Sequence, residues 1–446
     1  MHLRYMARGS PPNRSQKPCT LDRAVADPNL YDVAVIGAGY VGLPLAVTFA
    51  EAGGRVLVID VQPRVVEALN GGTSHIEDIT SDRLAALVDK GLVVASTDYE
   101  QCKHAHAVLI ALPTPLSRQR EPDLSYIERA AQSLAPTLQR GQVVVLESTT
   151  WPGTTREILQ PILEQGSGLT AGTDFHLAMS PERVDPGRED WTTKTTPKVV
   201  GGITPESTKA AADVYRAALD TVHEVSTPDA AELTKLLENI YRAVNIALVN
   251  ELAQLCDRME IDVWEVIDAA ATKPFGFASF KPGPGLGGHC IPIDPFYLTW
   301  KAREYDFSTR FIELAGEVNN NMPYFCRSLI SQALNHGANK SVSGSKILII
   351  GVAYKPDIGD YRETPAEKLI HLLQSAGADV SYHDPFVPEF DGLTSVPLEP
   401  EAYDCVAIVT NHSSIDYAEL VRRSSVIVDF RNATKGIDAP GKVWKL

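Results

Sequence analysis

The stretch from Phe280 to Pro295 combines residue types that could do covalent chemistry. Four of the six residues from Gly283 to Gly288 are glycines, so the backbone can pass close to a ligand, and they lead directly to Cys290. Asp294 followed by Pro295 is typical of an N-cap and first helical residue, which leaves Cys290 just before a helix N-terminus, where a thiolate is favoured. Cys290 is therefore a candidate nucleophile. The alternatives are that it is a small buried apolar residue and that Asp294 only caps the helix.

A long helical pattern supplies a second pair of polar residues, Lys235 and Asn239. Their i, i+4 spacing places an ammonium group and an amide on one helix face, where both could bind one substrate oxygen. The alternative is an ordinary solvated face.

Three loops follow expected parallel strands, and ligands gather beyond the carboxyl ends of such strands. They are Pro113 to Pro115, which contains Thr114, then Glu147 to Thr150, and Ser180 to Glu182. Each loop could instead be a simple turn or helix cap.

A glycine motif typical of dinucleotide binding follows the first expected strand and opens a helical pattern. Gly37 permits the tight turn, Gly39 lets the backbone approach a pyrophosphate, and Gly42 allows close packing of helix and strand, with Tyr40 and Val41 between them. Asp60 ends the second strand, where an acidic residue accepts hydrogen bonds from the adenosine ribose. Its charge favours NAD over NADP. Arg64 lies close by as a possible cofactor contact or a plain surface residue.

A loop after a later strand carries Lys355 and Arg362, which suit phosphate contacts, although an exposed basic loop is the alternative. Thr364 and Glu367 form a capping box with Pro365 at the first position of the next helix.

Alternating β-branched runs and amphipathic segments predict the scaffold, an α/β fold with two doubly wound, Rossmann-like domains. The expected strands are Val33 to Ile36, Arg55 to Ile59, Ala107 to Ala111, Val143 to Leu146, His176 to Met179 and Lys198 to Val200, then Lys346 to Ile350, Asp379 to Tyr382, Cys405 to Val409 and Val426 to Asp429. Between the two series, Ala230 to Met259 contains no Gly or Pro and predicts a helix long enough to bridge domains or pair with its own copy. The expected divisions are a tail (1–30), a dinucleotide domain (31–225), a helical region (226–338) and a second Rossmann-like domain (339–446).

The composition excludes several classes of protein. The 446-residue chain is 44% hydrophobic and 22% charged, as in ordinary globular proteins, and its net charge of -15 opposes nucleic-acid binding. Six scattered cysteines without C-x-x-C spacing indicate neither a disulfide framework nor a zinc site and favour a reducing cytoplasm. No apolar run approaches the roughly 20 residues of a membrane span. Residues 1–30 lack the apolar segment of a signal peptide and are expected to be a disordered tail, with a transit peptide as the alternative.

With these residues assembled, the chain resembles the UDP-glucose/GDP-mannose dehydrogenase family from about residue 31 to 435. Within that family, the stretches Ser180 to Gly187, Glu232 to Asn239 and Lys273 to Phe277, with Pro282 to Pro295, are similar to the bacterial UDP-N-acetylglucosamine 6-dehydrogenase group. The resemblance implies an NAD domain, a helical dimer-forming middle and a UDP-binding domain.

The resemblance also implies roles for individual residues. The implied catalytic residues are Cys290, Lys235, Asn239, Asp294, Thr150 and Glu182. The implied cofactor contacts are Gly37, Gly39, Tyr40, Val41, Gly42, Asp60, Arg64, Thr114, Thr150 and Arg362. The implied substrate contacts are Glu182, Arg183, Lys235, Asn239, Phe280, Gly287 and Lys355. No metal is implied.

Three positions depart from the UDP-glucose branch of the family: Ile293 replaces Lys, Pro186 replaces a second Glu, and His289 replaces Tyr or Ser. These differences favour an N-acetylated sugar. The expected activity is four-electron oxidation of the C6 alcohol of a UDP-N-acetylhexosamine, with UDP-GlcNAc as the expected sugar, through a cysteine thiohemiacetal and thioester. The product would serve surface polysaccharide synthesis, and the expected assembly is at least a homodimer.

Other readings remain at this point. The sugar could be UDP-glucose or UDP-ManNAc. A two-domain hydroxyacid dehydrogenase would share the glycine motif and long helix but form one NADH per substrate. A non-catalytic NAD-binding sensor would bind NADH without turnover.

Overall fold

The computed structural model describes residues 31–76, 78–115, 122–184, 190–288 and 291–446. The predicted nucleophile Cys290, together with His289, Pro186 and the predicted tail of residues 1–30, lies outside the described residues. The described chain forms two compact units. The first contains residues 31–112, 130–147 and 160–227 except the gap at 77 and that at 185–189, and the second contains the remaining described residues.

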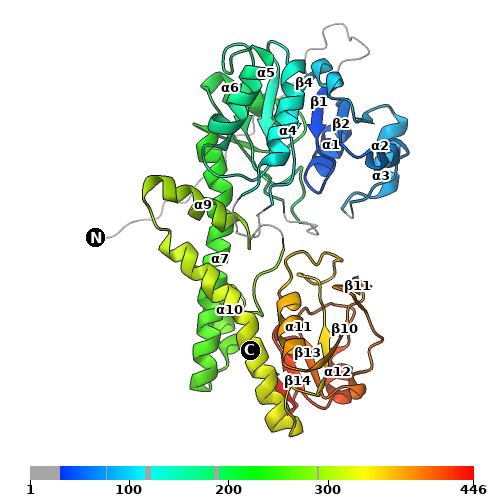
Figure 1. Ribbon diagram of the computed structural model, residues 1–446, viewed down its shortest axis with the longest axis vertical. Helices are drawn as coiled ribbons and strands as arrows, with labels where there is room; N and C mark the ends of the chain where they lie inside the picture. The colour runs from blue at the N-terminus through cyan, green and yellow to red at the C-terminus, as the bar shows by residue number, and fades with distance from the viewer. Residues whose placement is uncertain (1–30, 77, 116–121, 185–189, 289–290) are drawn as a thin grey trace. The chain divides into compact units, whose positions relative to one another are not determined.

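The first unit is built on an eight-stranded sheet in the order β3-β2-β1-β4-β5-β6-β7-β8 (Figure 1). Its strands are β1 (Tyr31–Ile36), β2 (Val56–Ile59), β3 (Val93–Ser96), β4 (Ala105–Ile110), β5 (Val143–Leu146), β6 (His176–Met179), β7 (Lys198–Gly202) and β8 (Val222–Val225). Neighbours pair in parallel except β6 with β7, which pair antiparallel. The sheet is therefore mainly parallel, as expected, with one reversed pairing that the β-branched runs could not indicate.

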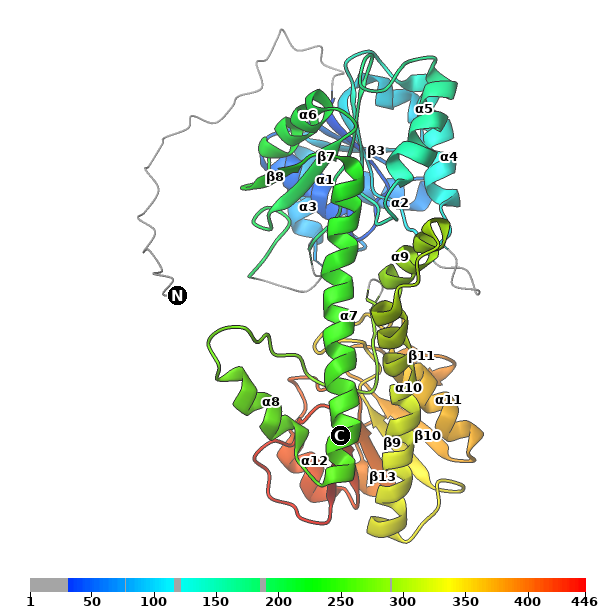
Figure 2. The same ribbon diagram turned by 90° about the vertical axis from the view of Figure 1, so that its left-hand side faces the viewer.

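Helices cover this sheet on both faces. They are α1 (Gly42–Glu51), α2 (Pro63–Asn70), α3 (Ser81–Asp89), α4 (Ser125–Leu134), α5 (Gln160–Ser167) and α6 (Pro205–Arg216). Apolar side chains of α1 and α6 share one core with the sheet, and Figure 2 shows α5 on the opposite side of the sheet from α6. This is the doubly wound arrangement that places strand-to-helix loops at the sheet's carboxyl edge.

The long helix α7 (Pro228–Met259) has 32 residues and confirms the predicted uninterrupted helix. It begins at Pro228, with Asp229 in its first turn, where a proline and a negative charge are both favoured. It packs along α10 (Arg310–Ala333), as Figure 2 shows. The opposite face is an exposed apolar stripe, which we call the α7 stripe; it consists of Leu233, Leu237, Tyr241, Leu248, Leu252, Leu255 and Met259.

The second unit also contains a parallel five-stranded sheet, in the order β10-β9-β13-β14-β15. Its strands are β9 (Lys346–Ile350), β10 (Asp379–His383), β13 (Cys405–Ile408), β14 (Ile427–Asp429) and β15 (Val443–Lys445), and a hairpin is formed by β11 (Glu389–Phe390) and β12 (Leu393–Thr394). In β9, Ile347 and Ile349 enter the core under α10 and α11 (Pro365–Ser375), whereas Leu348 and Ile350 face α12 (Tyr417–Arg423). Both faces are buried, which explains the continuous apolar run.

The remaining helices of the second unit are α8 (Val263–Ala271) and α9 (Asp294–Ala302). Among the described residues, no helix combines the length and apolarity that crossing a membrane requires. The predicted divisions at residues 225 and 338 stay predictions, although α7 starts at Pro228 and β9 at Lys346, close to both.

Candidate active site

The glycine loop between β1 and α1 has the geometry that a bound pyrophosphate requires. Gly37 has φ of 101°, in the region that side chains avoid, and a Cβ on Gly42 would come within 1.9 Å of the Gly37 carbonyl oxygen. Gly39 is open, since a Cβ there would meet nothing within 4 Å. The N-cap of α1 is Val41, whose side chain supplies no capping hydrogen bond. The backbone N–H groups at this helix start are thus suited to an anionic ligand.

Asp60 follows β2 and fixes the glycine loop. Its carboxylate accepts hydrogen bonds from the backbone N–H of Ala38 at 3.1 Å and of Gln62 at 2.9 Å. Arg64 is exposed and donates to the Gln62 amide oxygen at 3.1 and 3.0 Å. The residues present therefore fit NAD: glycines for the pyrophosphate, and a carboxylate at the strand end for the ribose.

A buried polar cluster of the second unit lies between α7 and α9. Asn239 donates a hydrogen bond of 2.5 Å to the Asp294 carboxylate, and the charge of Lys235 acts on the same carboxylate. All three side chains are buried, so the solvated-face reading of Lys235 and Asn239 is wrong. Burial raises the pKa of Asp294 to about 6, against the lowering influence of Lys235 and of the Asn239 hydrogen bond. The pair that sequence spacing placed on one face thus meets a carboxylate 55 residues away.

The reading of Asp294 as an N-cap needs correction. The N-cap of α9 is Ile293, and Asp294 is the first helical residue, followed by Pro295. The Asp294 side chain is only 3% exposed and turns toward Asn239 rather than the helix N-terminus. A carboxylate at this position complements the helix dipole in either arrangement, which is why the sequence pattern misled.

The loop after β5 is fixed to α7 by a residue that sequence reasoning did not select. The buried carboxylate of Glu232 accepts hydrogen bonds from the Gly153 N–H at 2.7 Å, from the Thr155 N–H at 2.9 Å and from the Thr155 hydroxyl at 2.8 Å. Burial raises the pKa of Glu232 to about 7, opposed by these hydrogen bonds. Glu232 precedes Lys235 by about one helical turn and so lies on the same face of the predicted helix. This shared face was the sequence signal that could have identified Glu232.

Thr150 lies in this same loop and is almost fully buried. Its hydroxyl has no hydrogen-bond partner within the described part of the chain. Thr114 is also buried, and its hydroxyl donates to the Thr149 carbonyl at 2.8 Å, while the Tyr297 hydroxyl of α9 donates to the Thr114 carbonyl. The two predicted loop residues are therefore close to each other, and the Thr150 hydroxyl is a buried polar group without a partner among the described residues.

Glu182 belongs to a separate buried network in the first unit. Its carboxylate accepts hydrogen bonds from the N–H groups of Arg183 and Val184 at 2.7 and 2.6 Å and lies 3.4 Å from the Lys198 ammonium. Lys198 also binds Glu147 at 2.6 Å, and the Arg183 guanidinium donates to the Pro197 carbonyl at 2.6 Å. The structure thus places Glu182 and Arg183 beside Lys198. Sequence spacing could not indicate that Lys198 is a partner of these residues.

Lys355 and Arg362 lie on the loop after β9 in the second unit, and the predicted residues Gly287 and Phe280 belong to the same unit. Arg362 forms an ion pair of 2.6 Å with Asp360, and Lys355 is half-buried. Gly287 lies on this loop, because a Cβ there would come within 2.7 Å of the Tyr354 Cβ. Phe280 packs edge-to-face on Tyr241, with 5.7 Å between ring centroids.

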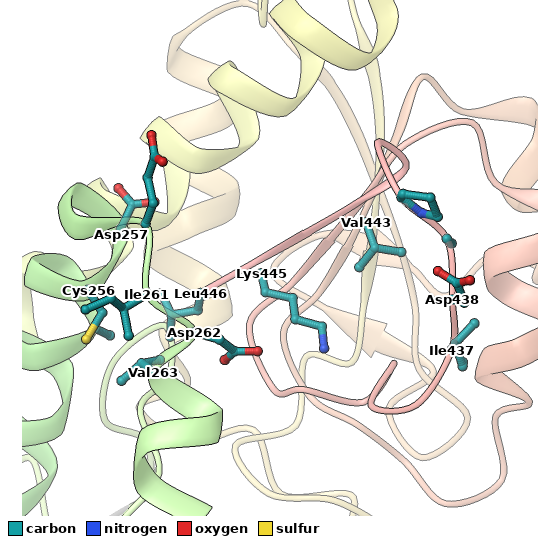
Figure 3. A pocket seen from close by; sticks show the side chains of 14 residues that line it. Cys256, Asp257, Ile261, Asp262, Val263, Ile437, Asp438, Val443, Lys445 and Leu446 are labelled. Atoms are coloured by element: carbon teal, nitrogen blue, oxygen red, sulfur yellow. The ribbon is translucent and has the colours of Figure 1, made fainter.

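A cavity of about 470 Å³ opens elsewhere in the second unit, between the end of α7, the start of α8 and the C-terminal segment. Figure 3 shows Lys445 extending between Asp262 and Asp438. No predicted site residue that the structure describes lines this cavity, so it is separate from the candidate active site.

Two Rossmann-like sheets, a dinucleotide loop and a buried Lys-Asn-Asp cluster define a nicotinamide-dependent oxidoreductase. The chain belongs to the UDP-glucose/GDP-mannose dehydrogenase family, whose NAD binding domain matches residues 31–219, central domain residues 229–321 and UDP binding domain residues 348–436. It is thus an enzyme of the UDP-sugar dehydrogenase class with NAD as its cofactor. Neither the hydroxyacid dehydrogenase nor the sensor reading is favoured.

Known relatives extend over nearly the whole chain. The UDP-N-acetyl-D-mannosamine dehydrogenase of Pyrococcus horikoshii is 36% identical over 410 residues, covering 90% of this chain and 96% of the relative. The UDP-N-acetyl-D-glucosamine 6-dehydrogenase of Pseudomonas aeruginosa is 34% identical over 390 residues, covering 85% and 90%. A solved structure of UDP-D-ManNAc dehydrogenase from Pyrococcus horikoshii has a TM-score of 0.85 at 34% identity and covers 93% of this chain and 98% of its own.

Proposed function

We propose that this chain oxidises the C6 alcohol of a UDP-N-acetylhexosamine, with UDP-GlcNAc as the first candidate, to the uronic acid. The observation that carries the proposal is the buried cluster of Lys235, Asn239 and Asp294 within the family's central domain. A cation, an amide and a carboxylate with a pKa of about 6 are the groups that an alcohol-to-acid oxidation uses.

The glycine loop would hold NAD, which would supply the hydride acceptor for two successive oxidations, since converting an alcohol to a carboxylate removes four electrons. The hydroxyl proton of the first oxidation would be released to solvent. Between the two oxidations, the Cys290 sulfur adds to the aldehyde carbon and gives a thiohemiacetal. The thiol proton passes to the former carbonyl oxygen through Asp294 or solvent, so the step is balanced. The second oxidation leaves a thioester. Water then breaks its C–S bond, which releases the carboxylate and restores the thiol. The product would serve surface polysaccharide synthesis.

The residues of the cluster have distinct proposed tasks. Lys235 and the second amide hydrogen of Asn239, whose first hydrogen is donated to Asp294, stabilise negative charge on the substrate oxygen. Asp294 exchanges protons with water or substrate, because its pKa of about 6 is closer to neutral pH than that of an ordinary aspartate. The unpartnered Thr150 hydroxyl supports a contact with the reacting part of the ligand. Lys355 and Arg362 are proposed contacts of the uridine diphosphate and of the cofactor region.

The covalent step is tested by counting NADH per sugar and weighing the intact protein. Wild type should form two NADH without free aldehyde, and Cys290→Ala should lose overall oxidation yet keep NAD binding. Complete two-NADH turnover by Cys290→Ala would refute the covalent mechanism.

The sugar is tested with a panel of UDP-GlcNAc, UDP-GalNAc, UDP-ManNAc and UDP-glucose, followed by NADH absorbance. UDP-ManNAc is the second candidate, because the Pyrococcus relative named for it is 36% identical. Ile293, Pro186 and His289 support an N-acetylated sugar. A higher kcat/KM for UDP-glucose than for every N-acetylated sugar would refute this assignment.

The proposed assembly is a homodimer that pairs through the α7 stripe. Seven large apolar side chains repeat at intervals of three, four or seven residues along the helix face opposite the buried cluster. An exposed apolar stripe of this length on one helix favours pairing with a second copy.

A further inference from the structure

His412 lies after β13 and makes two hydrogen bonds in the interior of the second unit. Its Nε2 atom is 3.0 Å from an oxygen of Asp384, and both side chains are fully buried. Its Nδ1 atom accepts a hydrogen bond of 3.0 Å from the backbone N–H of Asp357. Because Nδ1 accepts, the ring proton is assigned to Nε2, which donates to the carboxylate. The ring thus joins two segments that are far apart in sequence.

The Asp384 carboxylate is held in place by four backbone N–H groups. One oxygen accepts hydrogen bonds from the N–H groups of Val352 and Ala353 at 2.8 and 3.0 Å, and the other from those of Phe386 and Val387 at 2.9 and 3.2 Å. Burial opposes ionisation of Asp384, but the His412 and backbone hydrogen bonds outweigh it and hold the pKa below its usual value. The start of the loop after β9 is therefore anchored by Asp384 itself.

The far part of that loop depends on His412. Asp357 has φ of 63°, a conformation that non-glycine residues adopt rarely, and two hydrogen bonds hold it there. One is its N–H bond to His412, and the other runs from the Ser413 N–H to the Asp357 carboxylate at 2.8 Å. Asp357 lies between Lys355 and Arg362, the two basic residues proposed to face the ligands.

The same loop supports the glycine-rich segment that precedes the predicted nucleophile. The Gly288 N–H donates to the Arg362 carbonyl at 3.1 Å. A Cβ on Gly287 would come within 2.7 Å of the Tyr354 Cβ, so the two backbones are in direct contact. A shift of the loop would therefore move the segment ending at Gly288.

We propose that His412 is a positioning residue that, by accepting the Asp357 N–H, sets both the UDP-binding loop and the segment leading to Cys290. This rests on the proposed function, since it takes Lys355 and Arg362 as ligand contacts and Cys290 as the nucleophile. His412 itself touches neither substrate nor cofactor in this scheme.

Two substitutions separate the two hydrogen bonds. In His412→Asn, the amide oxygen reaches the position of Nδ1 and keeps the bond to Asp357, but the bond to Asp384 is lost. In His412→Gln, the amide nitrogen reaches the position of Nε2 and keeps the bond to Asp384, but the bond to Asp357 is lost. Each variant removes one hydrogen bond of the ring. The bond to the Asp384 carboxylate is the stronger because its acceptor is charged, so His412→Asn should lose at least as much Tm as His412→Gln. A UDP-binding defect confined to His412→Gln therefore cannot come from lost stability.

The experiment measures the Kd of UDP by calorimetry on the full chain, with Tm, kcat and KM, for wild type and both variants. We expect His412→Gln to bind UDP about tenfold more weakly, the effect of about 1.4 kcal/mol, and to lower kcat as well as raise KM. His412→Asn should stay within about threefold of wild type. The rate at which iodoacetamide alkylates Cys290 should be the same in His412→Asn as in wild type, and it should differ from wild type in His412→Gln.

Each other result has a defined meaning. Equal UDP affinity in all three proteins, or losses that follow Tm alone in both variants, would overturn the positioning role while leaving the proposed function intact. Failure of wild type to bind UDP would overturn the proposed function and the positioning role together.

Discussion

Replacing Asn239 by alanine should raise the pKa of Asp294 and move the acidic limb of the pH-rate profile to higher pH. The Asp294 carboxylate is buried and accepts a hydrogen bond of 2.5 Å from the Asn239 amide. Burial raises its pKa to about 6, while Lys235 and Asn239 lower it. After the substitution, the charge of Lys235 still opposes the effect of burial on the pKa of Asp294.

The size of the shift follows from the strength of one hydrogen bond to a charged group. Such a bond contributes about 1.5 to 3 kcal/mol, which corresponds to about 1 to 2 pKa units. The limb should therefore move from about pH 6 to between about 7 and 8. In the proposed mechanism the activity needs the ionised Asp294 carboxylate, so it should be lost below this limb and present above it.

The assay is kcat/KM for UDP-GlcNAc between pH 5 and 9, from initial rates of NADH formation at saturating NAD. The profile of kcat/KM reports groups of the free enzyme, and the limb's position is independent of the height of the profile. A lower rate in Asn239→Ala therefore does not obscure the shift.

A matched control comes from Asn250, a second buried asparagine on α7. Its amide donates to Asn319 at 2.9 Å and accepts from the Gly283 N–H at 2.9 Å. Asn250 lies about three helical turns from Asn239 along α7. Asn250→Ala should lose comparable stability with the limb still near pH 6. An unmoved limb in Asn239→Ala, or an equal shift in both variants, would refute the reasoning.

Three further predictions concern other parts of the chain. Burial raises the pKa of Glu232 to about 7 from an ordinary value of 4.5, so the folded protein retains a proton that the unfolded chain releases. The contribution of this proton to the stability of the fold is therefore full below about pH 4.5 and is lost as the pH rises through about 7. Glu232→Gln should remove about 2 kcal/mol of the difference in unfolding free energy between pH 5 and pH 7.5, measured by urea unfolding. Identical pH dependence in both proteins would count against it. Leu248→Glu in the α7 stripe should convert a dimeric wild type to monomers in light scattering, and a monomeric wild type at micromolar concentration would contradict the proposed dimer. Asp60→Ala should narrow the preference for NAD over NADP in steady-state kinetics, and equal efficiency of wild type with both cofactors would show the prediction to be wrong.

Much of the fold could be predicted because buried parallel strands and a long helix leave local signatures. Runs such as Val143 to Leu146 and Lys346 to Ile350 are apolar on both faces, and the structure has strands at these positions. The missed strands are β3, β8 and β15, which lie at the edges of their sheets, and the two-residue strands β11 and β12. The burial pattern of β8 shows the reason, since its four residues are exposed or half-buried and carry no apolar run.

The site could be predicted only where the chemistry is local. The glycine loop needs its residues at fixed offsets, so the sequence alone indicated it. The partner of Asn239 is 55 residues away, and the partner loop of Glu232 is 77 to 79 residues away. Such pairs depend on how helices and loops pack, which no spacing rule in a single chain expresses. Glu232, Lys198, Asp384 and His412 were not selected for the same reason.

The saturated carboxylate of Asp384 bears on competition between ligands. Asp60 and Asp384 both follow the second strand of a Rossmann-like sheet, and each accepts N–H groups of the loop after the first strand. Asp384, however, accepts five hydrogen bonds from the protein, so its oxygens have no capacity left for the diol of a ribose. A dinucleotide therefore cannot bind at the second sheet with its ribose on Asp384, in the way that Asp60 suits the ribose at the first sheet. Excess NAD should act as a poor competitor of the UDP-sugar, which lets both ligands stay saturating through two successive oxidations.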